Sequence, residues 1–354
     1  MSSDTDKPSS AFNLPYNQAP YYWIAVSYVT QPGLKMGLAE LGMKSYKALE
    51  NTYMKRVPAP WGEAWKKLYA VLEEQAALDV AQVAVLPGEE DPDLREIIFS
   101  RKPPATIMTL AEGLWLGQAL LEDRVLCYMQ PVLDKRRKVF GYEAFARVES
   151  DKEVIGGGKI IKAGKDLNIE YQLDRHLHVK AIKSFISSEL EGFLFINFLP
   201  GFIHRPEKYL EGLTDAVKLY NMPSKQIVLD VTQSETSQDL QHLKSIVDYC
   251  RSKGYSLALD DIASVSAAKK IFETIRPDFI KLDINLVKKA QSVLEQNTIK
   301  ELVSLAHASG AAVLAEGVET EEVHQELMKA DVDLFQGYLF SPPVAVTELK
   351  KVAG

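Results

Sequence analysis

The chain has 354 residues, of which 46% are hydrophobic and 25% are charged, and its 48 acidic residues outnumber its 41 basic residues. This length predicts two domains, or one large barrel with an appendage, and the composition is that of a globular protein. The net charge of -7 argues against long nucleic acids as partners, but it is compatible with a local basic pocket for a small phosphate ligand.

Cysteine usage and the start of the chain indicate the compartment. Cys127 and Cys250 are too few for a disulfide framework, and neither belongs to a zinc-type motif. No apolar run reaches the ~18 to 20 residues that a membrane span needs, and the polar start MSSDTDKPSS lacks the pattern of a signal peptide. We therefore expect a cytoplasmic protein.

The first part of the chain predicts a tail and a small α/β domain. Residues 1–18 are rich in Ser, Asp, Pro and Asn, which is typical of a flexible tail. Residues 19–108 alternate strand-like runs such as YYWIAVSYV with helix-like runs such as WGEAWKKLYAVLEEQAAL. We expect a regulatory or partner-binding domain there, whose signal or partner the sequence does not name. A helix near 107–124 is expected to couple it to the following domain.

From residue 109 to residue 354, strand-like and helix-like segments alternate about eight times. Apolar strands that are each followed by a helix are typical of parallel strands buried on both faces, so the pattern predicts a (β/α)8 barrel of the TIM type. The segment CYMQPVLDKRRKVFGYEAF turns back too quickly for a crossover helix. One strand of this modified barrel is therefore expected to be antiparallel.

Polar side chains collect near the carboxyl ends of the expected strands, where such barrels place their catalytic groups. They are Glu143, Asn197, Asp230, Asp260, Asp261, Lys281, Glu316, Glu319 and Gln336. Any single carboxylate could instead cap a helix, a role that would suit Asp261. Several buried carboxylates together require a cation, and their oxygens are ligands that Mg²⁺ or Mn²⁺ prefers. The cluster indicates metal-assisted phosphodiester hydrolysis, and we expect the six histidines to be ordinary surface or core residues.

Six motifs follow one another along this part of the chain. They are YMQPVLDKRRKVFGYEAFAR, INFLP, VLDVTQSE, ALDD, FIKLD and LAEGVETEEVHQELMKADVDLFQGYLFSPP. From about residue 113 onward the chain resembles the EAL family of cyclic-di-GMP phosphodiesterases. The resemblance implies a barrel that binds two Mg²⁺ or Mn²⁺ ions and cleaves cyclic-di-GMP to pGpG. It also makes a homodimer through the barrel plausible.

The resemblance further implies roles for single residues of this sequence. The expected metal ligands are Glu143, Asn197, Asp230, Asp260 and Asp261. The expected catalytic groups are Glu143, Lys281 at the phosphate and the attacking water, and Glu316 as general base. The expected ligand contacts are Gln130, Arg147, Glu319 and Gln336, with Arg147 at a phosphate.

Two stretches depart from the family pattern. The family motif LEITES has glutamates where this chain has Asp230 and Gln233, and the shorter Asp230 leaves little slack for a Mg²⁺ ligand. The family loop DDFGTGYSS reads DDIASVSAA here and lacks both glycines, which permit conformations that other residues resist. These changes favour a degenerate receptor with weak or no turnover slightly over an active phosphodiesterase. A ligand-free interaction scaffold is the third alternative.

Overall fold

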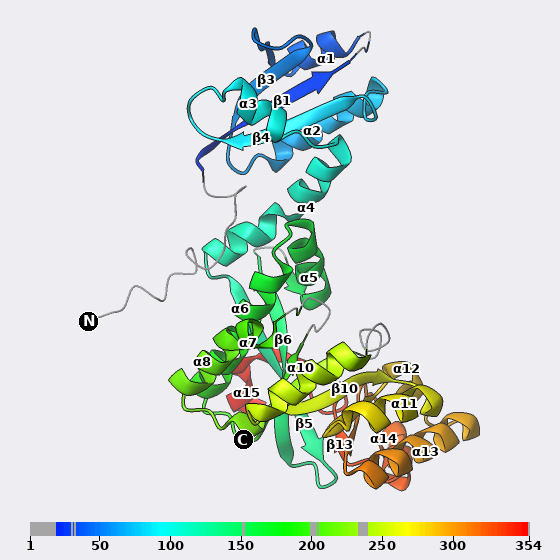
Figure 1. The fold of residues 1–354 in the computed structure, drawn as a ribbon. Helices are drawn as coiled ribbons and strands as arrows, with labels where there is room; N and C mark the ends of the chain where they lie inside the picture. Colours follow the sequence, from blue (N-terminus) through cyan, green and yellow to red (C-terminus); the bar gives the residue numbers. More distant parts are fainter. Residues whose placement is uncertain are drawn as a thin grey trace. The chain divides into compact units, whose positions relative to one another are not determined.

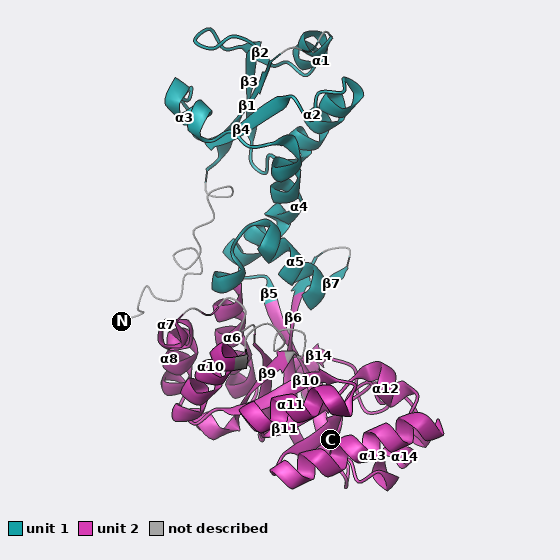
Figure 2. Cartoon of the chain, turned by 45° about the vertical axis from the view of Figure 1, so that its right-hand side comes forward, with its two compact units in different colours: residues 1–125, 148–172 teal, residues 126–147, 173–354 magenta. Residues whose placement is uncertain are grey.

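The structure of the chain is a computed structural model, which describes residues 19–29, 31, 33–150, 153–198, 203, 205–232 and 240–352. It contains two compact units, shown in Figure 2. Unit 1 comprises residues 1–125 and 148–172, and unit 2 comprises residues 126–147 and 173–354. No helix among the described residues is both long enough and apolar enough to span a membrane.

Unit 1 contains a four-stranded antiparallel sheet with the strand order β2-β3-β1-β4 (Figure 1). The strands are β1 (Tyr21–Tyr28), β2 (Lys44–Ser45), β3 (Thr52–Pro58) and β4 (Ala81–Pro87). The helices are α1 (Leu34–Glu40), α2 (Gly62–Glu74), α3 (Leu94–Phe99), α4 (Pro104–Leu121) and α5 (Gly157–Asp166). From β1 to β4 the elements follow the β-α-β-β-α-β order of a ferredoxin-like domain.

The sheet of unit 1 is covered on both faces because β1 is apolar on both sides. On one face Ala25 packs with Ile97 of α3. On the other face Ile24 lines a common cavity with Leu68 of α2. All four of these side chains are at most 3% exposed, so the alternation of side chains along β1 places one apolar row in each of two cores.

Unit 2 is built around a closed barrel of eight strands, in the order β5-β13-β12-β11-β10-β9-β8-β6, with β6 pairing back to β5. The remaining strands, β7 and β14, extend the sheet at its two ends. The strand bounds are β5 (Val125–Asp134), β6 (Val139–Glu149), β7 (Val154–Gly156), β8 (Phe193–Asn197), β9 (Ile227–Thr232), β10 (Ser256–Ile262), β11 (Phe279–Leu282), β12 (Ala312–Ala315), β13 (Leu334–Phe335) and β14 (Val344–Ala345).

The strands from β6 through β8, β9, β10, β11 and β12 to β13 pair in parallel, whereas β5 is antiparallel to β13. This arrangement confirms the predicted modified TIM barrel with one antiparallel strand. Helices follow the parallel strands and lie around the outside of the barrel (Figure 1). Their bounds are α6 (Glu170–Ser187), α7 (Pro206–Tyr209), α8 (Glu211–Leu219), the 3-10 turn η4 (Ser224–Gln226), α10 (Leu240–Ser252), α11 (Val265–Ile275), α12 (Ile284–Lys288), α13 (Val293–Ser309), α14 (Glu321–Lys329) and α15 (Val346–Val352).

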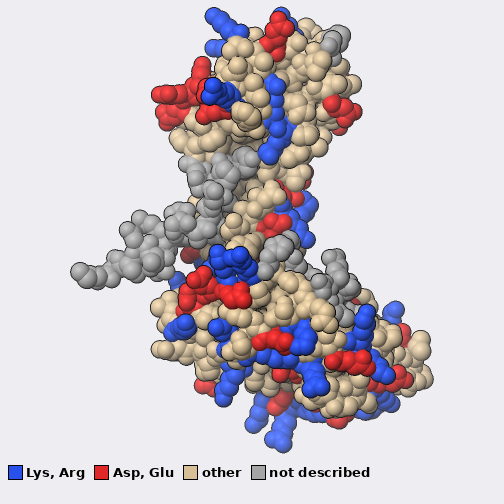
Figure 3. All heavy atoms as spheres, in the orientation of Figure 1, with Lys and Arg blue, Asp and Glu red and all other residues tan. Residues whose placement is uncertain are grey.

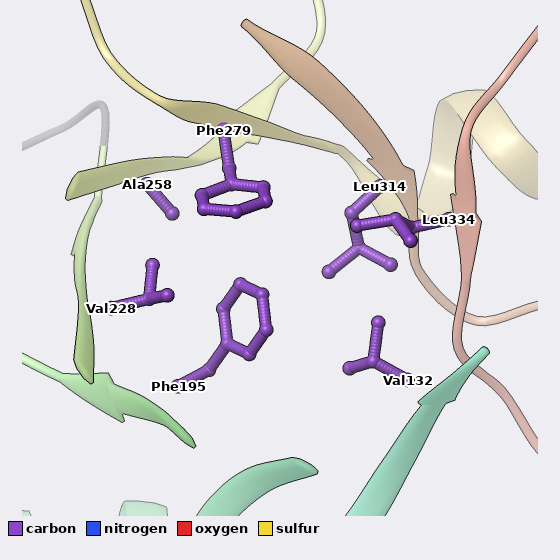
Figure 4. Close-up of a cluster of buried hydrophobic side chains, with 7 residues drawn as sticks. All are labelled: Val132, Phe195, Val228, Ala258, Phe279, Leu314 and Leu334. Carbon is purple, nitrogen blue, oxygen red and sulfur yellow. The ribbon is translucent and has the colours of Figure 1, made fainter. Parts of the chain in front are cut away.

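The inside of the barrel is a packed apolar core (Figure 4). Its buried members are Val132, Phe195, Val228, Ala258, Phe279, Leu314 and Leu334. The rings of Phe195 and Phe279 meet edge to face, with centroids 5.4 Å apart and planes at 69°. Because side chains fill the interior, a ligand can reach the barrel only at its ends.

Charges are mixed over the surface. Among the described residues on the face drawn in Figure 3, acidic and basic side chains are interspersed rather than separated into fields of one sign. Mixed charges cancel at long range, so attraction of a charged ligand has to come from local pockets.

Candidate metal and ligand site at the barrel mouth

The chemistry-bearing side chains form the layer next to the apolar core. Alternate residues of a strand point to the same face, so a residue two positions after a core residue shares its direction. The pairs of core and polar residues are Phe195 and Asn197, Val228 and Asp230, Ala258 and Asp260, Phe279 and Lys281, Leu314 and Glu316, and Leu334 and Gln336. In the antiparallel β5 the order is reversed, and Gln130 precedes Val132. This spacing places one polar layer at the carboxyl ends of the parallel strands.

Lys281 of β11 lies at the centre of this layer, and its side chain is completely buried. Its ammonium Nζ is 2.6 Å from Oε1 of Glu316 and 3.0 Å from Oδ2 of Asp230. It is also 3.2 Å from Oε1 of Glu143 and 3.6 Å from Oδ2 of Asp260. One cation therefore faces four carboxyl groups that come from four other strands or strand ends.

Burial and mutual repulsion shift the proton affinities in this cluster. Burial raises the pKa of Asp230 to about 8, and it raises that of Glu316 well above its ordinary value, although Lys281 lowers both. Burial alone would lower the pKa of Lys281, but the surrounding carboxylates, Asp230 first, raise it well above its ordinary value. Lys281 is therefore charged at neutral pH, and Asp230 and Glu316 favour their protonated forms unless a further cation joins them.

The residues of this layer fit a hard divalent cation. Two buried carboxylate oxygens, Oε2 of Glu143 and Oδ1 of Asp230, have no hydrogen-bond partner. Oxygens of Asp260, Asp261 and Glu316 lie within 4.8 Å of one another, and no other group of His, Cys, Asp and Glu does so within the described ranges. Buried carboxylate oxygens without donors are the ligands that Mg²⁺ and Mn²⁺ take.

A β-bulge explains how two successive aspartates reach the same site. Neighbouring residues of a regular strand point to opposite faces. From Leu259 to Ile262, however, β10 advances three residues while the paired β11 advances two, from Ile280 to Leu282. Asp261 takes up the extra residue in a left-handed conformation, with a φ of 60°, and its N–H donates to Oδ1 of Asp260 at 2.8 Å. The bulge thus brings both carboxylates toward Glu316.

Helix capping after β10 is carried by another residue than Asp261. The N-cap of α11 is Ser264, whose hydroxyl accepts a hydrogen bond from the N–H of Ala267 at 3.3 Å. The capping role considered for Asp261 therefore belongs to Ser264, and the Asp261 carboxylate stays with the acidic cluster.

Asn197 stands at the end of β8, where its Cα pairs with that of Asp230. Its carbonyl accepts a hydrogen bond from Nε2 of the buried His178 at 3.1 Å, and the same ring nitrogen is 3.4 Å from the buried Asp174 carboxylate. The sequence predicted His178 only as an ordinary histidine. The spacing of Asp174 and His178 by four residues on α6 is the signal that points to a buried pair facing one place.

Two glutamines lie together at the rim of this layer. Nε2 of Gln336 donates to Oε1 of Gln130 at 3.1 Å, and Nε2 of Gln130 donates to the carbonyl of Ser341 at 2.9 Å. Both side chains are buried, and Oε1 of Gln336 has no hydrogen-bond partner. The pair holds the chain after β13 against β5 and leaves one acceptor for a ligand donor.

Two other predicted contacts have partners outside the acidic cluster. The guanidinium of Arg147 donates to the carbonyl of Ala146 at 2.9 Å and lies 5.7 Å from the ring of Tyr128. Glu319 is half-exposed and forms an ion pair with Lys288 at 2.9 Å. Residue 233, the other position expected to depart from the family motif, lies outside the described residues.

The comparison with protein families decides the assignment, because residues 114–343 match the EAL domain. The chain belongs to the EAL domain family. The probable cyclic di-GMP phosphodiesterase PdeI of Escherichia coli K12 is a relative, 24% identical over 252 residues that cover 68% of this chain and 32% of PdeI. The uncharacterized EAL-domain containing protein YkuI of Bacillus subtilis 168 is 26% identical over 62% of this chain and 55% of its own length. The chain thus spans only part of these relatives.

A solved structure has the same architecture as the EAL domain described here. It is the c-di-GMP bound form of a standalone versatile EAL protein from Vibrio cholerae O395, with a TM-score of 0.58 and 29% sequence identity. The match covers 63% of this chain and 93% of that protein. The similarity therefore concerns the barrel rather than the whole chain.

The two stretches where the sequence is expected to depart from the EAL pattern can be located in the structure. At the first, Oδ2 of Asp230 accepts a hydrogen bond from Lys281 at 3.0 Å, and Oδ1 has no hydrogen-bond partner. In the loop, Ile262 is completely buried as the last residue of β10. The glycine-free loop thus ends the strand with an apolar anchor, and an aspartate adopts the left-handed conformation, which Asp tolerates better than most residues.

Proposed function

We propose that this EAL domain binds cyclic-di-GMP at its acidic barrel mouth and hydrolyses it to pGpG with Mg²⁺ or Mn²⁺. The observation that carries the proposal is the convergence of Glu143, Asp230, Asp260 and Glu316 on Lys281. A pure receptor needs no such set. The names of PdeI and of the Vibrio cholerae complex describe those proteins, and they support the choice of ligand for this one.

The side chains of the mouth divide into holding and reacting groups. The groups proposed to hold the metal ions are Glu143, Asn197, Asp230, Asp260 and Asp261. When bound, such ions offset phosphate charge and lower the pKa of a water molecule. The Lys281 ammonium would stabilise negative charge on the phosphate, because a buried cation acts strongly in a site from which water is excluded. Glu316 would accept a proton from the attacking water once bound metal ions favour its ionised form, because only the carboxylate can act as a general base.

The ligand contacts that the family resemblance implies are kept as proposals. Gln336 and Gln130 line the rim with one free acceptor. Arg147 is half-buried, and its positive charge would suit a phosphate of the ligand. Glu319 would have to leave Lys288, an exchange that is easy for a half-exposed pair.

A receptor that binds cyclic-di-GMP with weak or no turnover is the second candidate. Asp230 supports it, because its side chain is one methylene shorter than glutamate and one of its two oxygens is already engaged by Lys281. Metal–oxygen distances for Mg²⁺ leave little slack. A site that binds one metal ion loosely would still bind cyclic-di-GMP, but it would hydrolyse it slowly or not at all.

A phosphorus NMR time course separates the candidates. The full chain is mixed near-stoichiometrically with cyclic-di-GMP, first in excess Mg²⁺ and then in excess Mn²⁺. Growth of a phosphomonoester signal with the natural chain, but not with Glu143→Gln, supports hydrolysis. A shifted diester signal that never cleaves supports the receptor. An unchanged diester signal contradicts both proposals and favours the interaction scaffold.

We also propose that residues 19–108 regulate the barrel through the helix near 107–124. The division near residue 108 and the homodimer stay predictions. Deleting residues 1–103 should change ligand affinity, turnover or the molecular mass measured by light scattering. If all three quantities were unchanged, the regulatory role would be wrong.

A further inference from the structure

The ferredoxin-like part of unit 1 contains a cavity of about 330 Å³ that the barrel chemistry does not use. Residues of β1 and β3 line one side of it, and residues of α2 and of the chain that follows α1 line the other. Its apolar lining consists of Ile24, Leu41, Met43, Val57, Pro58, Pro60, Ala64 and Leu68. Small-molecule sites in proteins are typically apolar cavities of about 300 to 1,000 Å³ with a few polar groups.

The polar groups of this cavity are mainly cationic. Lys55, Arg56 and Lys67 line it together with a single acid, Glu63. The Arg56 side chain points to the opposite face of the sheet from Lys55, and its guanidinium lies 4.5 Å from the centre of the Tyr21 ring, so the charges of Lys55 and Lys67 face one negative charge at the cavity. The chain as a whole carries a net charge of -7. The excess of positive charge at the cavity is therefore a local property of β3 and α2.

The three cations are held in different ways. Lys55 pairs with Ile24 in the sheet, so both side chains are on the face that lines the cavity. Its Nζ donates to the carbonyl of Leu41 at 2.6 Å. Arg56 donates to the carbonyl of Glu89 at 3.0 Å. Lys67 forms no salt bridge with any described residue. Leu41 is the C-cap residue of α1, so the contact of Lys55 with its carbonyl caps the end of that helix. This role accounts for Lys55, but it accounts neither for the cavity nor for Lys67.

The acid of the cavity is already engaged elsewhere. Glu63 pairs with Lys66 at 2.7 Å, and this pair is exposed to solvent. Lys66 does not line the cavity. An anionic group inside the cavity would thus lie near Lys67 and Lys55. The charge of Lys66 would partly offset the repulsion of this group by Glu63.

We propose that this cavity binds a small organic anion with an apolar body, whose carboxylate, sulfonate or phosphate group lies against Lys67 and Lys55. The apolar body rests on Ile24, Val57 and Leu68. This site is independent of the proposed function of the barrel, because all of its groups belong to unit 1.

The probe for a test is 8-anilinonaphthalene-1-sulfonate, an apolar aromatic anion that fluoresces when it leaves water. Titrated into the full chain, it should give a saturable signal. Ala64→Leu fills the cavity and should weaken binding at least tenfold, and Lys67→Glu should do the same by repulsion. The matched control is Lys35→Glu, an exposed lysine of α1 outside the cavity, which should change affinity less than twofold.

A neutral probe, N-phenyl-1-naphthylamine, completes the design. It should respond to Ala64→Leu and hardly to Lys67→Glu, because it lacks the anionic group. Unchanged sulfonate affinity in Lys67→Glu, or an equal loss in Lys35→Glu, would overturn the proposal. Lys67 is exposed, so its variant should fold even if the Ala64 variant does not, and circular dichroism checks both.

Discussion

Replacing Lys281 by methionine removes the single cation from among four carboxyl groups and keeps a side chain of similar volume. At an effective dielectric constant of about 20, a unit charge pair 3.0 Å apart interacts by roughly 5 kcal/mol before desolvation is counted. Breaking a buried pair by removing one partner costs about 3 to 5 kcal/mol. We therefore expect the metal-free variant to lose about 3 to 5 kcal/mol in its free energy of unfolding.

The loss should depend on pH with a definite sign. Burial raises the folded-state pKa of Asp230 from 3.8 to about 8, and Lys281 lowers it from what burial alone would give. A carboxyl group whose pKa is raised in the folded state lowers the stability of the protein as the pH rises toward that pKa. The reason is that the unfolded chain releases this proton at a lower pH than the folded chain does. Without Lys281 this pKa rises further, so the difference between the variant and the natural chain should widen above about pH 8.

Urea unfolding in a chelator, at about pH 6 and about pH 9, measures both effects. The control is Lys288→Met, which removes a half-exposed lysine paired with Glu319 and should cost less than about 1 kcal/mol. Saturating Mn²⁺ should stabilise Lys281→Met by about 3 kcal/mol at a hundred times its dissociation constant. Equal losses in the two lysine variants, or a difference that shrinks as the pH rises, would refute the reasoning.

Three further predictions concern the same barrel. Asp230→Glu restores the longer carboxylate and should raise the rate of phosphomonoester formation in Mg²⁺; a lower rate would show that length at this position does not limit turnover. Ser264→Ala removes the N-cap of α11 and should lower the free energy of unfolding by about 1 kcal/mol, whereas an effect near zero would contradict the capping role. Phe195→Ala opens the packed core against Phe279 and should cost about 3 to 5 kcal/mol by the same measurement, and a loss below that of Ser264→Ala would show that the core relaxes.

The sequence predicted the barrel well because its strands are buried on both faces. All four residues of β11 are buried, and such a short apolar run before a helix is unlike any exposed element. The fast turn between β5 and β6 correctly predicted one antiparallel strand. In unit 1 the sequence indicated strands and helices, but β2 has only two residues and leaves no periodic signal from which its place could be predicted.

The site was harder to predict than the fold. The positions at the strand ends predicted which polar residues form the site. The contacts of Lys281 with four acids, however, depend on distances across the barrel that no local sequence pattern predicts. The missing glycines suggested a loop that resists the family's shape, yet Asp261 itself adopts the left-handed conformation at a bulge. His178 shows the same limit, because its contact with the end of β8 joins elements that are separate in sequence.

The two-residue offset between the core layer and the polar layer has a consequence for how such a protein can change over time. In these strands one residue packs in the apolar core, and the next residue on the same face is a polar residue of the site, as with Val228 and Asp230. A substitution at the outer position alters reach, charge or metal preference while the hydrophobic packing beneath stays as it was. A change of side-chain length at such a position, as between Asp and Glu, can therefore alter the site without disturbing the core, whereas the loss of the central Lys281 charge would also cost stability.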